Sequence, residues 1–217
     1  EVQEVWWTPI LPPALIAVTV SMTIFPLSTG LMVSLDPFCP LEEIDVEFMD
    51  RKPNFWALIP LYWDMLMESK RIPEDYDMSH LRTIGAGAEA MNDRKYAEVE
   101  AFFHKHNVKA KFSAGYGQSE GCSNFTLPNP MFPLEDGCVG MPMPATVLAV
   151  FDKDLNELNY GESGELCMMG PSMMLHYSGW RGEEMTEKTL VEHPDGNTWL
   201  HTGDEAYITE QGIVHIL

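Results

Sequence analysis

Apolar runs alternate with amphipathic stretches through the first two thirds of the chain. Between the runs, apolar side chains recur at helical spacing, as in the stripe Tyr96, Val99 and Phe103 of a helix expected to begin at Asn92. Further helices are expected over 14–25, from Leu41, and over 61–69. The apolar runs themselves have the length of buried strands and cover residues 31–35, 55–59, 81–85 and 109–114.

Two of the predicted helices differ in polarity. Residues 14–25 are apolar on nearly all sides, which is typical of a helix buried in a core. The helix that begins at Leu41 has one apolar stripe, and we expect its other face to be solvated, because it carries Glu42, Glu43, Asp45 and Glu47. Strands that alternate with helices in this way predict an α/β fold with a mostly parallel sheet and helices on both faces.

The pattern changes beyond residue 138. Helical periodicity disappears, and turn residues separate short apolar runs at 147–151, 165–169 and 212–216. Such runs are typical of antiparallel strands in a small barrel or sandwich. We therefore predict an α/β subdomain over residues 1–138 and a small antiparallel, barrel-like β-rich subdomain over 139–217.

A long uncharged stretch runs from Val5 to Leu35. Its length would allow it to cross a membrane. However, Pro12, Pro13 and Pro26 interrupt it, and no Lys or Arg follows until residue 51. We expect a buried helix that leads into a buried strand, and no membrane span.

Composition and charge narrow the classes of partner. The 217 residues include 13 Lys and Arg against 33 Asp and Glu, which gives a formal net charge of −20. Such a balance argues against nucleic acid and anionic lipid as partners, because binding to either requires clustered cations. A local phosphate site remains possible, since backbone amides and a bound metal can hold a phosphate.

The cysteines give no sign of a metal site or a disulfide framework. They are scattered, without a Cys-x-x-Cys pair, at positions 39, 122, 138 and 167. We expect free thiols and a cytoplasmic location.

Small residues cluster where two of the predicted strands end. Gly85-Ala-Gly-Ala-Glu89 follows one strand, and Gly115-Tyr-Gly-Gln-Ser-Glu-Gly121 follows the next. Open parallel sheets bind ligands at this edge, and small residues let the backbone approach a flat ring closely. A tyrosine can stack on such a ring, and the pair Ser119 and Glu120 suits a phosphate oxygen and Mg²⁺. Each feature alone is typical of a simple turn or a solvated carboxylate.

Four motifs together resemble the adenylate-forming (ANL) superfamily, which includes acyl-CoA synthetases, aryl-CoA ligases, luciferases and peptide-synthetase adenylation domains. Residues 115–120 resemble its Gly-Tyr-Gly-x-Thr-Glu motif, with Ser119 in place of Thr, and residues 139–142 resemble Val-Gly-x-Pro. Residues 161–166 resemble Gly-Glu-x-Gly-Glu-Leu, and residues 199–204 resemble aromatic-x-x-Thr-Gly-Asp. The motifs stand in the family's order, and the chain is most similar to an AMP-forming acyl-CoA synthetase.

The resemblance implies a role for individual residues. Tyr116 would stack on adenine beside Gly117, and Asp204 would accept hydrogen bonds from the ribose hydroxyls. Ser119 would contact the α-phosphate, and Glu120 would hold Mg²⁺. A turn of small residues would line the adenine pocket with its backbone. This turn consists of Gly87, Ala88, Glu89 and Ala90. Because Tyr116 and Asp204 fall on opposite sides of residue 138, we expect the effects of their substitution to be nearly additive.

The resemblance also implies a reaction and its cofactors. A small carboxylic acid would attack the α-phosphate of ATP, with Mg²⁺ in the site, to give an acyl-adenylate and pyrophosphate, and AMP would leave when the acyl group is transferred. A thiol such as coenzyme A would then take the acyl group as co-substrate. The first subdomain would carry half of the acyl and adenine sites, and the second the ribose-binding Asp204.

The ends of the chain suggest a middle piece of a larger enzyme. The chain begins with Glu1, not with Met, and the family's phosphate loop and C-terminal lysine would lie outside residues 1–217. We expect the isolated chain to form no acyl-adenylate, and an exposed apolar surface to favour self-association. Two alternatives remain, a non-catalytic nucleotide-binding or interaction module and part of a peptide-synthetase adenylation domain.

Overall fold

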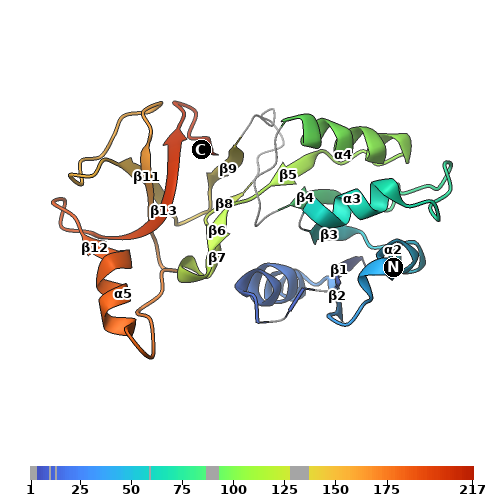
Figure 1. The fold of residues 1–217 in the computed structure, drawn as a ribbon, viewed down its shortest axis with the longest axis horizontal. Coiled ribbons are helices and arrows are strands. Elements are labelled where there is room, and N and C mark those ends of the chain that lie inside the picture. The colour runs from blue at the N-terminus through green and yellow to red at the C-terminus, as the bar shows by residue number, and fades with distance from the viewer. Residues whose placement is uncertain (1–3, 10, 13, 59, 87–92, 128–136) are drawn as a thin grey trace. The chain divides into compact units, whose positions relative to one another are not determined.

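The chain forms two compact units, which we describe separately. A computed structural model describes residues 4–9, 11–12, 14–58, 60–86, 93–127 and 137–217 (Figure 1). The first unit comprises Glu1–Ala114 with Pro130–Asp136, and the second comprises Gly115–Asn129 with Gly137–Leu217. Residues 115–129, which we assigned to the first subdomain from the sequence, thus belong to the second unit. What each subdomain binds remains a prediction.

The first unit is built on five parallel strands in the order β2-β1-β3-β4-β5. Four of them overlap the predicted runs, and β1 was not predicted, because its residues were read as part of the uncharged stretch. The order 2-1-3-4-5 is that of flavodoxin-like doubly wound sheets. The strands are β1 (Val5–Pro9), β2 (Met32–Asp36), β3 (Phe55–Leu58), β4 (Thr83–Ala86) and β5 (Phe112–Ala114).

The strand order determines where the helices lie. From β1 to β2 the chain moves one way across the sheet, and from β2 onward it moves the other way. Because parallel crossovers are right-handed, η1 and α1 cover one face, and α2, α3 and α4 cover the other. The predicted α/β fold with a parallel sheet is confirmed. The helices are the π-helix η1 (Ala17–Ile24), α1 (Phe25–Ser28), the 3₁₀ turn η2 (Leu41–Glu43), α2 (Ile44–Arg51), α3 (Pro60–Glu68) and α4 (Asp93–Lys105).

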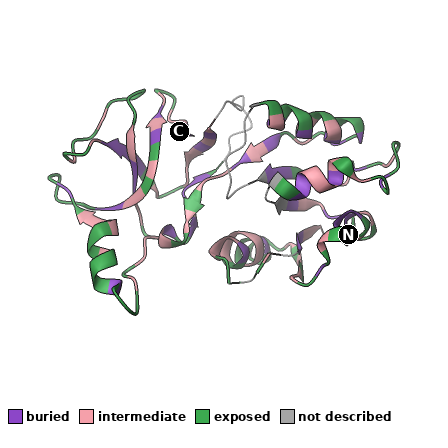
Figure 2. Cartoon of the chain, in the orientation of Figure 1, coloured by how far each residue is buried: buried purple, intermediate pink, exposed green. Residues whose placement is uncertain are grey.

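The first helical segment is more exposed than the sequence predicts. Only Val18 of η1 is buried, whereas Ile24, Phe25 and Leu27 are each more than half exposed. Figure 2 shows this helical segment mainly in the colours of intermediate and exposed residues. The expectation of a core helix over 14–25 is therefore wrong about its burial. These exposed apolar side chains leave the prediction of self-association in place. None of the helices that the structure describes has the length and apolarity needed to cross a bilayer.

Aromatic side chains dominate the core of the first unit. Trp56 of β3 is fully buried and stacks on Trp7 of β1 and Phe48 of α2, with ring centroids 5.1 and 4.8 Å apart. It meets Trp63 of α3 edge-on, and Trp63 in turn meets Phe103 of α4. Trp56 thus joins the sheet to two of its covering helices. The predicted stripe of α4 is confirmed, since Tyr96, Val99 and Phe103 are all buried.

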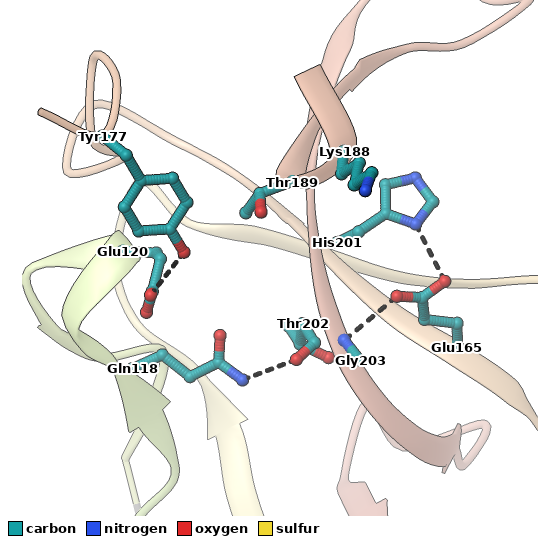
Figure 3. A pocket seen from close by; sticks show the side chains of 9 residues that line it. All are labelled: Gln118, Glu120, Glu165, Tyr177, Lys188, Thr189, His201, Thr202 and Gly203. Atoms are coloured by element: carbon teal, nitrogen blue, oxygen red, sulfur yellow. Dashed lines mark hydrogen bonds and ion pairs between the residues drawn. The ribbon is translucent and has the colours of Figure 1, made fainter. Parts of the chain in front are cut away.

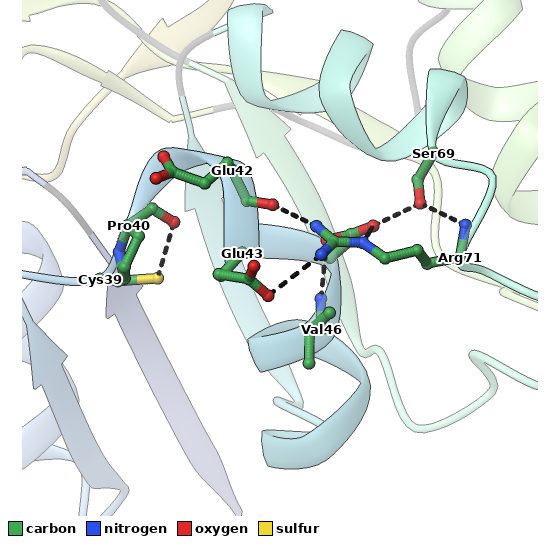
Figure 4. Close-up of polar contacts among 8 residues, drawn as sticks. Cys39, Pro40, Glu42, Glu43, Val46, Ser69 and Arg71 are labelled. Atoms are coloured by element: carbon green, nitrogen blue, oxygen red, sulfur yellow. Dashed lines mark hydrogen bonds and ion pairs between the residues drawn. The ribbon is translucent and has the colours of Figure 1, made fainter.

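One acidic residue of α2 is buried rather than solvated. Asp45 is 4% exposed and accepts hydrogen bonds from the Ser69 hydroxyl and the Arg71 guanidinium. Arg71 also pairs with Glu43 at 3.1 Å (Figure 4). Burial alone would raise the pKa of Asp45, but the hydrogen bonds from Arg71 and Ser69 outweigh it and lower that pKa. The predicted solvated face is wrong at this position, because Arg71 comes from a distant segment.

The second unit is antiparallel, as predicted. Its main sheet has the order β10-β11-β13-β14-β9-β8, with β12 paired to β13, and β6 and β7 form a separate hairpin. The strands are β6 (Gly117–Gln118), β7 (Ser123–Asn124), β8 (Thr126–Leu127), β9 (Cys138–Pro142), β10 (Val147–Phe151), β11 (Gly164–Met169), β12 (Leu190–Glu192), β13 (Thr198–Ile208) and β14 (Val214–Ile216).

A single α-helix in the described part of the second unit was not predicted. This helix, α5 (Gly182–Thr189), has the sequence Gly-Glu-Glu-Met-Thr-Glu-Lys-Thr and is largely exposed. Without an apolar stripe it has no helical pattern of hydrophobic residues. Salt bridges join Glu184 to Arg181 and Lys188 along its surface.

Candidate nucleotide site

A tight hairpin positions the Gly-Tyr-Gly segment. Strands β6 and β7 pair through a turn formed by the 3₁₀ helix η3 (Ser119–Gly121), followed by Cys122 and Ser123 with positive φ. A Cβ atom on Gly117 would lie 1.7 Å from the carbonyl oxygen of Ser123. Glycine is therefore required at this position, because the two backbones meet there.

The backbone of Tyr116 is fixed from both sides. Its N–H donates to Thr126 Oγ1 at 3.0 Å, and its carbonyl oxygen accepts from the N–H groups of Phe125 and Thr126. The Tyr116 ring packs edge-to-face on the buried Phe125, with centroids 5.7 Å apart. These contacts give the half-buried tyrosine a defined orientation.

An irregularity in β13 positions the Thr-Gly-Asp segment. Glu165 of β11 pairs with Glu205, and Cys167 pairs with His201, so two steps along β11 correspond to four along β13. The excess residues lie around Gly203, which has a φ of +78°. Bulges of this kind re-aim side chains beside functional sites. Here the segment is held by hydrogen bonds from Gly203 N–H to Glu165 and from Asp204 N–H to Thr202 Oγ1.

The two motifs meet in one hydrogen-bonded cluster, which we call the Asp204 cluster: Tyr116, Gln118, Thr202 and Asp204. The Tyr116 hydroxyl donates to Asp204 Oδ2. The Gln118 amide donates to the Thr202 carbonyl at 2.8 Å and also contacts Asp204 Oδ2 at 3.2 Å. Burial and the Asp204 carboxylate raise the pKa of Tyr116, so the phenol stays protonated and remains a donor.

The geometry of the Asp204 carboxylate leaves it able to accept more. All hydrogen bonds to this side chain within the described part of the chain go to Oδ2. Its Oδ1 atom is thus available to an outside donor such as a sugar hydroxyl. A carboxylate with one oxygen fixed by two donors is pre-oriented for such recognition.

Glu120 lies at the other end of the hairpin. Its Oε1 accepts a hydrogen bond from the Tyr177 hydroxyl at 2.6 Å, and its backbone carbonyl accepts from Met174 N–H. Burial and the neighbouring Glu120 raise the pKa of Tyr177, which therefore stays a donor. Oε2 of Glu120 and the hydroxyl of the exposed Ser119 are oxygen ligands of the type that Mg²⁺ prefers. The residues present therefore fit a magnesium ion.

A polar pocket of about 410 Å³ lies between these groups (Figure 3). The carboxylates of Glu120 and Glu165 line it, together with the ammonium group of Lys188 on α5. Glu165 accepts from His201 Nδ1 at 2.8 Å and from Gly203 N–H at 3.0 Å. The remaining lining residues are Gln118, Tyr177, Thr189, His201, Thr202 and Gly203.

The structure brings together two of the site residues predicted from the sequence. Tyr116 and Asp204 share one unit and one hydrogen bond, so the premise that they lie in different subdomains is wrong. Because contacting groups couple, we now expect their substitutions not to be additive. The predicted adenine-pocket turn, Gly87 to Ala90, lies outside the described residues.

Sequence reasoning missed Gln118 and Tyr177. Gln118 had a signal, since side chains two apart on extended backbone share a face, and Tyr116 is two residues away. No such local signal pointed to Tyr177, because it lies 57 residues from Glu120 along the chain.

Comparisons with known proteins show what the chain is similar to. The profile of the AMP-binding enzyme family matches residues 1–178. A long-chain-fatty-acid–CoA ligase of Escherichia coli O157:H7 is 38% identical over 104 residues, which are 48% of this chain and 17% of that protein. The long-chain-fatty-acid–CoA ligase of Bacillus subtilis is 31% identical over 188 residues, which are 85% of this chain and 31% of that protein.

A solved structure shares the whole fold. The long-chain-fatty-acid-CoA ligase FadD1 of Archaeoglobus fulgidus superposes with a TM-score of 0.82 at 21% identity, and the match covers 100% of this chain and 43% of that one. The chain thus spans less than half the length of the proteins it matches here.

Proposed function

The chain belongs to the family of AMP-binding enzymes, and from that premise we propose that it contributes the adenosine-binding part of an ATP-dependent acid–thiol ligase. The whole enzyme would form an acyl-adenylate from ATP and a carboxylic acid and pass the acyl group to a thiol such as coenzyme A. The observation that carries the proposal is the Asp204 cluster, in which two motifs 88 residues apart share a hydrogen bond.

Two side chains of the cluster would hold the nucleoside. Tyr116, braced by Phe125, would offer its ring to adenine by stacking. Asp204 would accept from the ribose hydroxyls through Oδ1, while Tyr116 and Gln118 hold Oδ2. Because these groups are oriented before the ligand binds, less conformational entropy is lost on binding.

Ser119 and Glu120 would act on the phosphate side. The Ser119 hydroxyl would donate to an oxygen of the α-phosphate, and Glu120 would hold Mg²⁺ through the oxygen that Tyr177 leaves free. Mg²⁺ when bound would neutralise charge on the phosphates. The role of Tyr177 would be to orient the Glu120 carboxylate, as hydrogen-bonded neighbours do for metal ligands.

The acid, the thiol and the location follow from the same proposal. The fatty-acid–CoA ligases named above support a carboxylic acid and coenzyme A as substrates. The four cysteines are all free, which supports a reducing cytoplasm.

Calorimetric titration with AMP and with ATP, with and without Mg²⁺, tests the proposal. We expect Tyr116→Ala and Asp204→Ala to weaken AMP binding about tenfold or more, because stacking and ribose contacts are lost. Glu120→Gln should leave AMP binding nearly unchanged and remove the gain that Mg²⁺ gives to ATP. Tyr160→Ala is the control, since Tyr160 is 65% exposed and outside the pocket.

Two results would count against the proposal. AMP binding that survives both Tyr116→Ala and Asp204→Ala would contradict the assignment of the adenosine site to these two residues. If Mg²⁺ still strengthens ATP binding in Glu120→Gln, Glu120 is not the residue that holds the metal ion. Acid-dependent exchange of pyrophosphate into ATP by the enzyme that contains this chain would separate a ligase from a non-catalytic nucleotide-binding module.

A further inference from the structure

A second group of polar side chains lies in the antiparallel unit, next to the pocket but separate from the Asp204 cluster. We call it the Cys-His-His cluster: Cys167 of β11, His193 after β12, and His201 of β13. Strand pairing places Cys167 directly opposite His201. The β12–β13 hairpin places His193 opposite Asn197, and the His193 side chain reaches His201, with the two Nε2 atoms 2.8 Å apart. Their ligand atoms lie within 4.8 Å of one another.

The cluster is nearly enclosed. Cys167 is fully buried, and His193 is 4% exposed. Phe151 and Trp199 pack around the His193 ring, with centroids 4.4 and 6.0 Å away. An aromatic shell of this kind holds ligand side chains in place.

For two neutral imidazoles, the hydrogen bonds determine which ring nitrogen carries the proton. A carboxylate only accepts, so His201 donates from Nδ1 to Glu165, and its Nε2 then accepts from His193 Nε2 at 2.8 Å. His193 Nδ1 is left as a buried acceptor without a hydrogen-bond partner among the described residues.

We propose that the Cys-His-His cluster binds a zinc ion or a similar borderline-soft divalent cation. One thiolate and two imidazoles match the ligand preference of zinc, whereas Mg²⁺ prefers oxygen. Zinc bonds of about 2.3 Å to sulfur and 2.0–2.1 Å to nitrogen place tetrahedral ligand atoms about 3.3–3.6 Å apart. The three ligand atoms, now within 4.8 Å of one another, would move to these separations when the ion binds.

The surroundings supply the other parts of a metal site. Glu165 accepts from His201 Nδ1, which is the carboxylate–histidine arrangement that orients a metal-bound imidazole. His201 also lines the pocket, so an ion and its fourth ligand, a water molecule, can enter there (Figure 3).

Protons balance when the metal binds. The Cys167 thiol loses one proton to solvent, and a sulfur–metal bond forms. The proton on His193 Nε2 moves to Nδ1, so that both Nε2 lone pairs face the ion. Binding thus releases one proton for each metal ion.

Titration of the whole chain with Zn²⁺, in a buffer that contains excess Mg²⁺ and no nucleotide, tests the proposal. We expect a one-to-one complex that raises the thermal unfolding temperature. With Co²⁺ as a spectroscopic substitute, a thiolate-to-cobalt charge-transfer band should appear. Cys167→Ser and His193→Asn should each weaken Zn²⁺ binding about a hundredfold or more, and Cys167→Ser should abolish the band. Cys138→Ser is the matched control, because Cys138 is also buried in this unit and outside the cluster.

The outcomes separate clearly. Absence of Zn²⁺ binding to the unmodified chain would overturn the proposal. Binding that persists in both Cys167→Ser and His193→Asn would also overturn it, since the ion would then sit elsewhere. Because the charge-transfer band is measured first on the unmodified chain, a misfolded variant cannot hide a negative result. The inference does not rest on the proposed function, and its tests need no nucleotide.

Discussion

The two units place their aromatic and polar side chains in opposite roles. In the first unit, Trp56 and its neighbours form a continuous buried stack that links the parallel sheet to its helices. In the second unit, Tyr116 turns its hydroxyl to the Asp204 carboxylate, and the polar groups gather around a pocket. This difference indicates which property a substitution in each unit should change. Changes in the first unit should mainly affect stability, whereas polar changes in the second should also show coupling between neighbours.

The largest expected effect is loss of the central ring of the stack. Trp56→Ala should lower the free energy of unfolding by about 3–5 kcal/mol, because a fully buried indole leaves a cavity. Urea denaturation followed by circular dichroism measures it. Trp180→Ala, which removes a tryptophan that is 90% exposed, should change stability by less than about 0.5 kcal/mol. Equal losses from the two variants would contradict the aromatic core described for the first unit.

The buried Asp45 is the polar exception in the first unit. Asp45→Asn should cost about 1.5–3 kcal/mol at neutral pH, because the charge-assisted hydrogen bonds from Arg71 and Ser69 weaken. Since its pKa is lowered in the folded state, this contribution is present above about pH 4 and is lost as the pH falls through the folded pKa.

The difference in stability between the parent chain and Asp45→Asn should therefore shrink in acid, as measured by urea titrations at several pH values. Asp50→Asn is the control, because Asp50 is an exposed acid on the same helix. A difference that stays constant down to pH values well below 4 would disprove the role given to the Asp45 charge.

In the second unit, backbone proximity should matter more than side-chain volume. Gly117→Ala should cost about 1–3 kcal/mol, since its Cβ would overlap the Ser123 carbonyl. Gly115→Ala, in the same motif, should cost less than about 0.5 kcal/mol, because its Cβ would lie 3.6 Å from the nearest atom. Thermal unfolding of the two variants compares them, and similar stability would rule out the close approach of β6 and β7.

The smallest expected effect is the coupling inside the Asp204 cluster. A double-mutant cycle with Tyr116→Phe and Asp204→Ala should give a coupling energy of about 1 kcal/mol in the free energy of unfolding. Denaturant unfolding of the four proteins provides it. A Tyr207→Phe and Asp204→Ala cycle serves as the control, because Tyr207 stacks on His215 and makes no described contact with Asp204. Strict additivity in the first cycle would contradict the hydrogen bond between Tyr116 and Asp204.

Much of the fold could be predicted from the sequence because its pattern is local. The stripe of α4 and the apolar run of β10 each contain within a few residues the periodicity that decides their structure. The motif residues Tyr116 and Asp204 could likewise be assigned, since they stand in short segments that resemble a known family.

The features that escaped prediction depend on residues far apart in the chain. Asp45 looks like any acid on a solvated face until Arg71 reaches it. The π-helical segment is apolar enough for a core, yet only one of its eight residues is buried, and no property of that segment alone shows this. The Cys-His-His cluster has no motif spacing, because strand pairing joins Cys167 to His201 and a side-chain contact joins His201 to His193.

The two extra residues of β13, which lie around Gly203, also have a consequence for redesign of the chain. Side chains on a strand alternate between faces, so an odd number of extra residues would invert every position that follows. The excess here is two, and Leu200, Ala206 and Ile208 all reach the same core on either side of it. Deletion of Gly203 alone would therefore direct the polar face of the strand into that core. Deletion of two residues would restore the parity of the strand and remove the loop that holds Asp204.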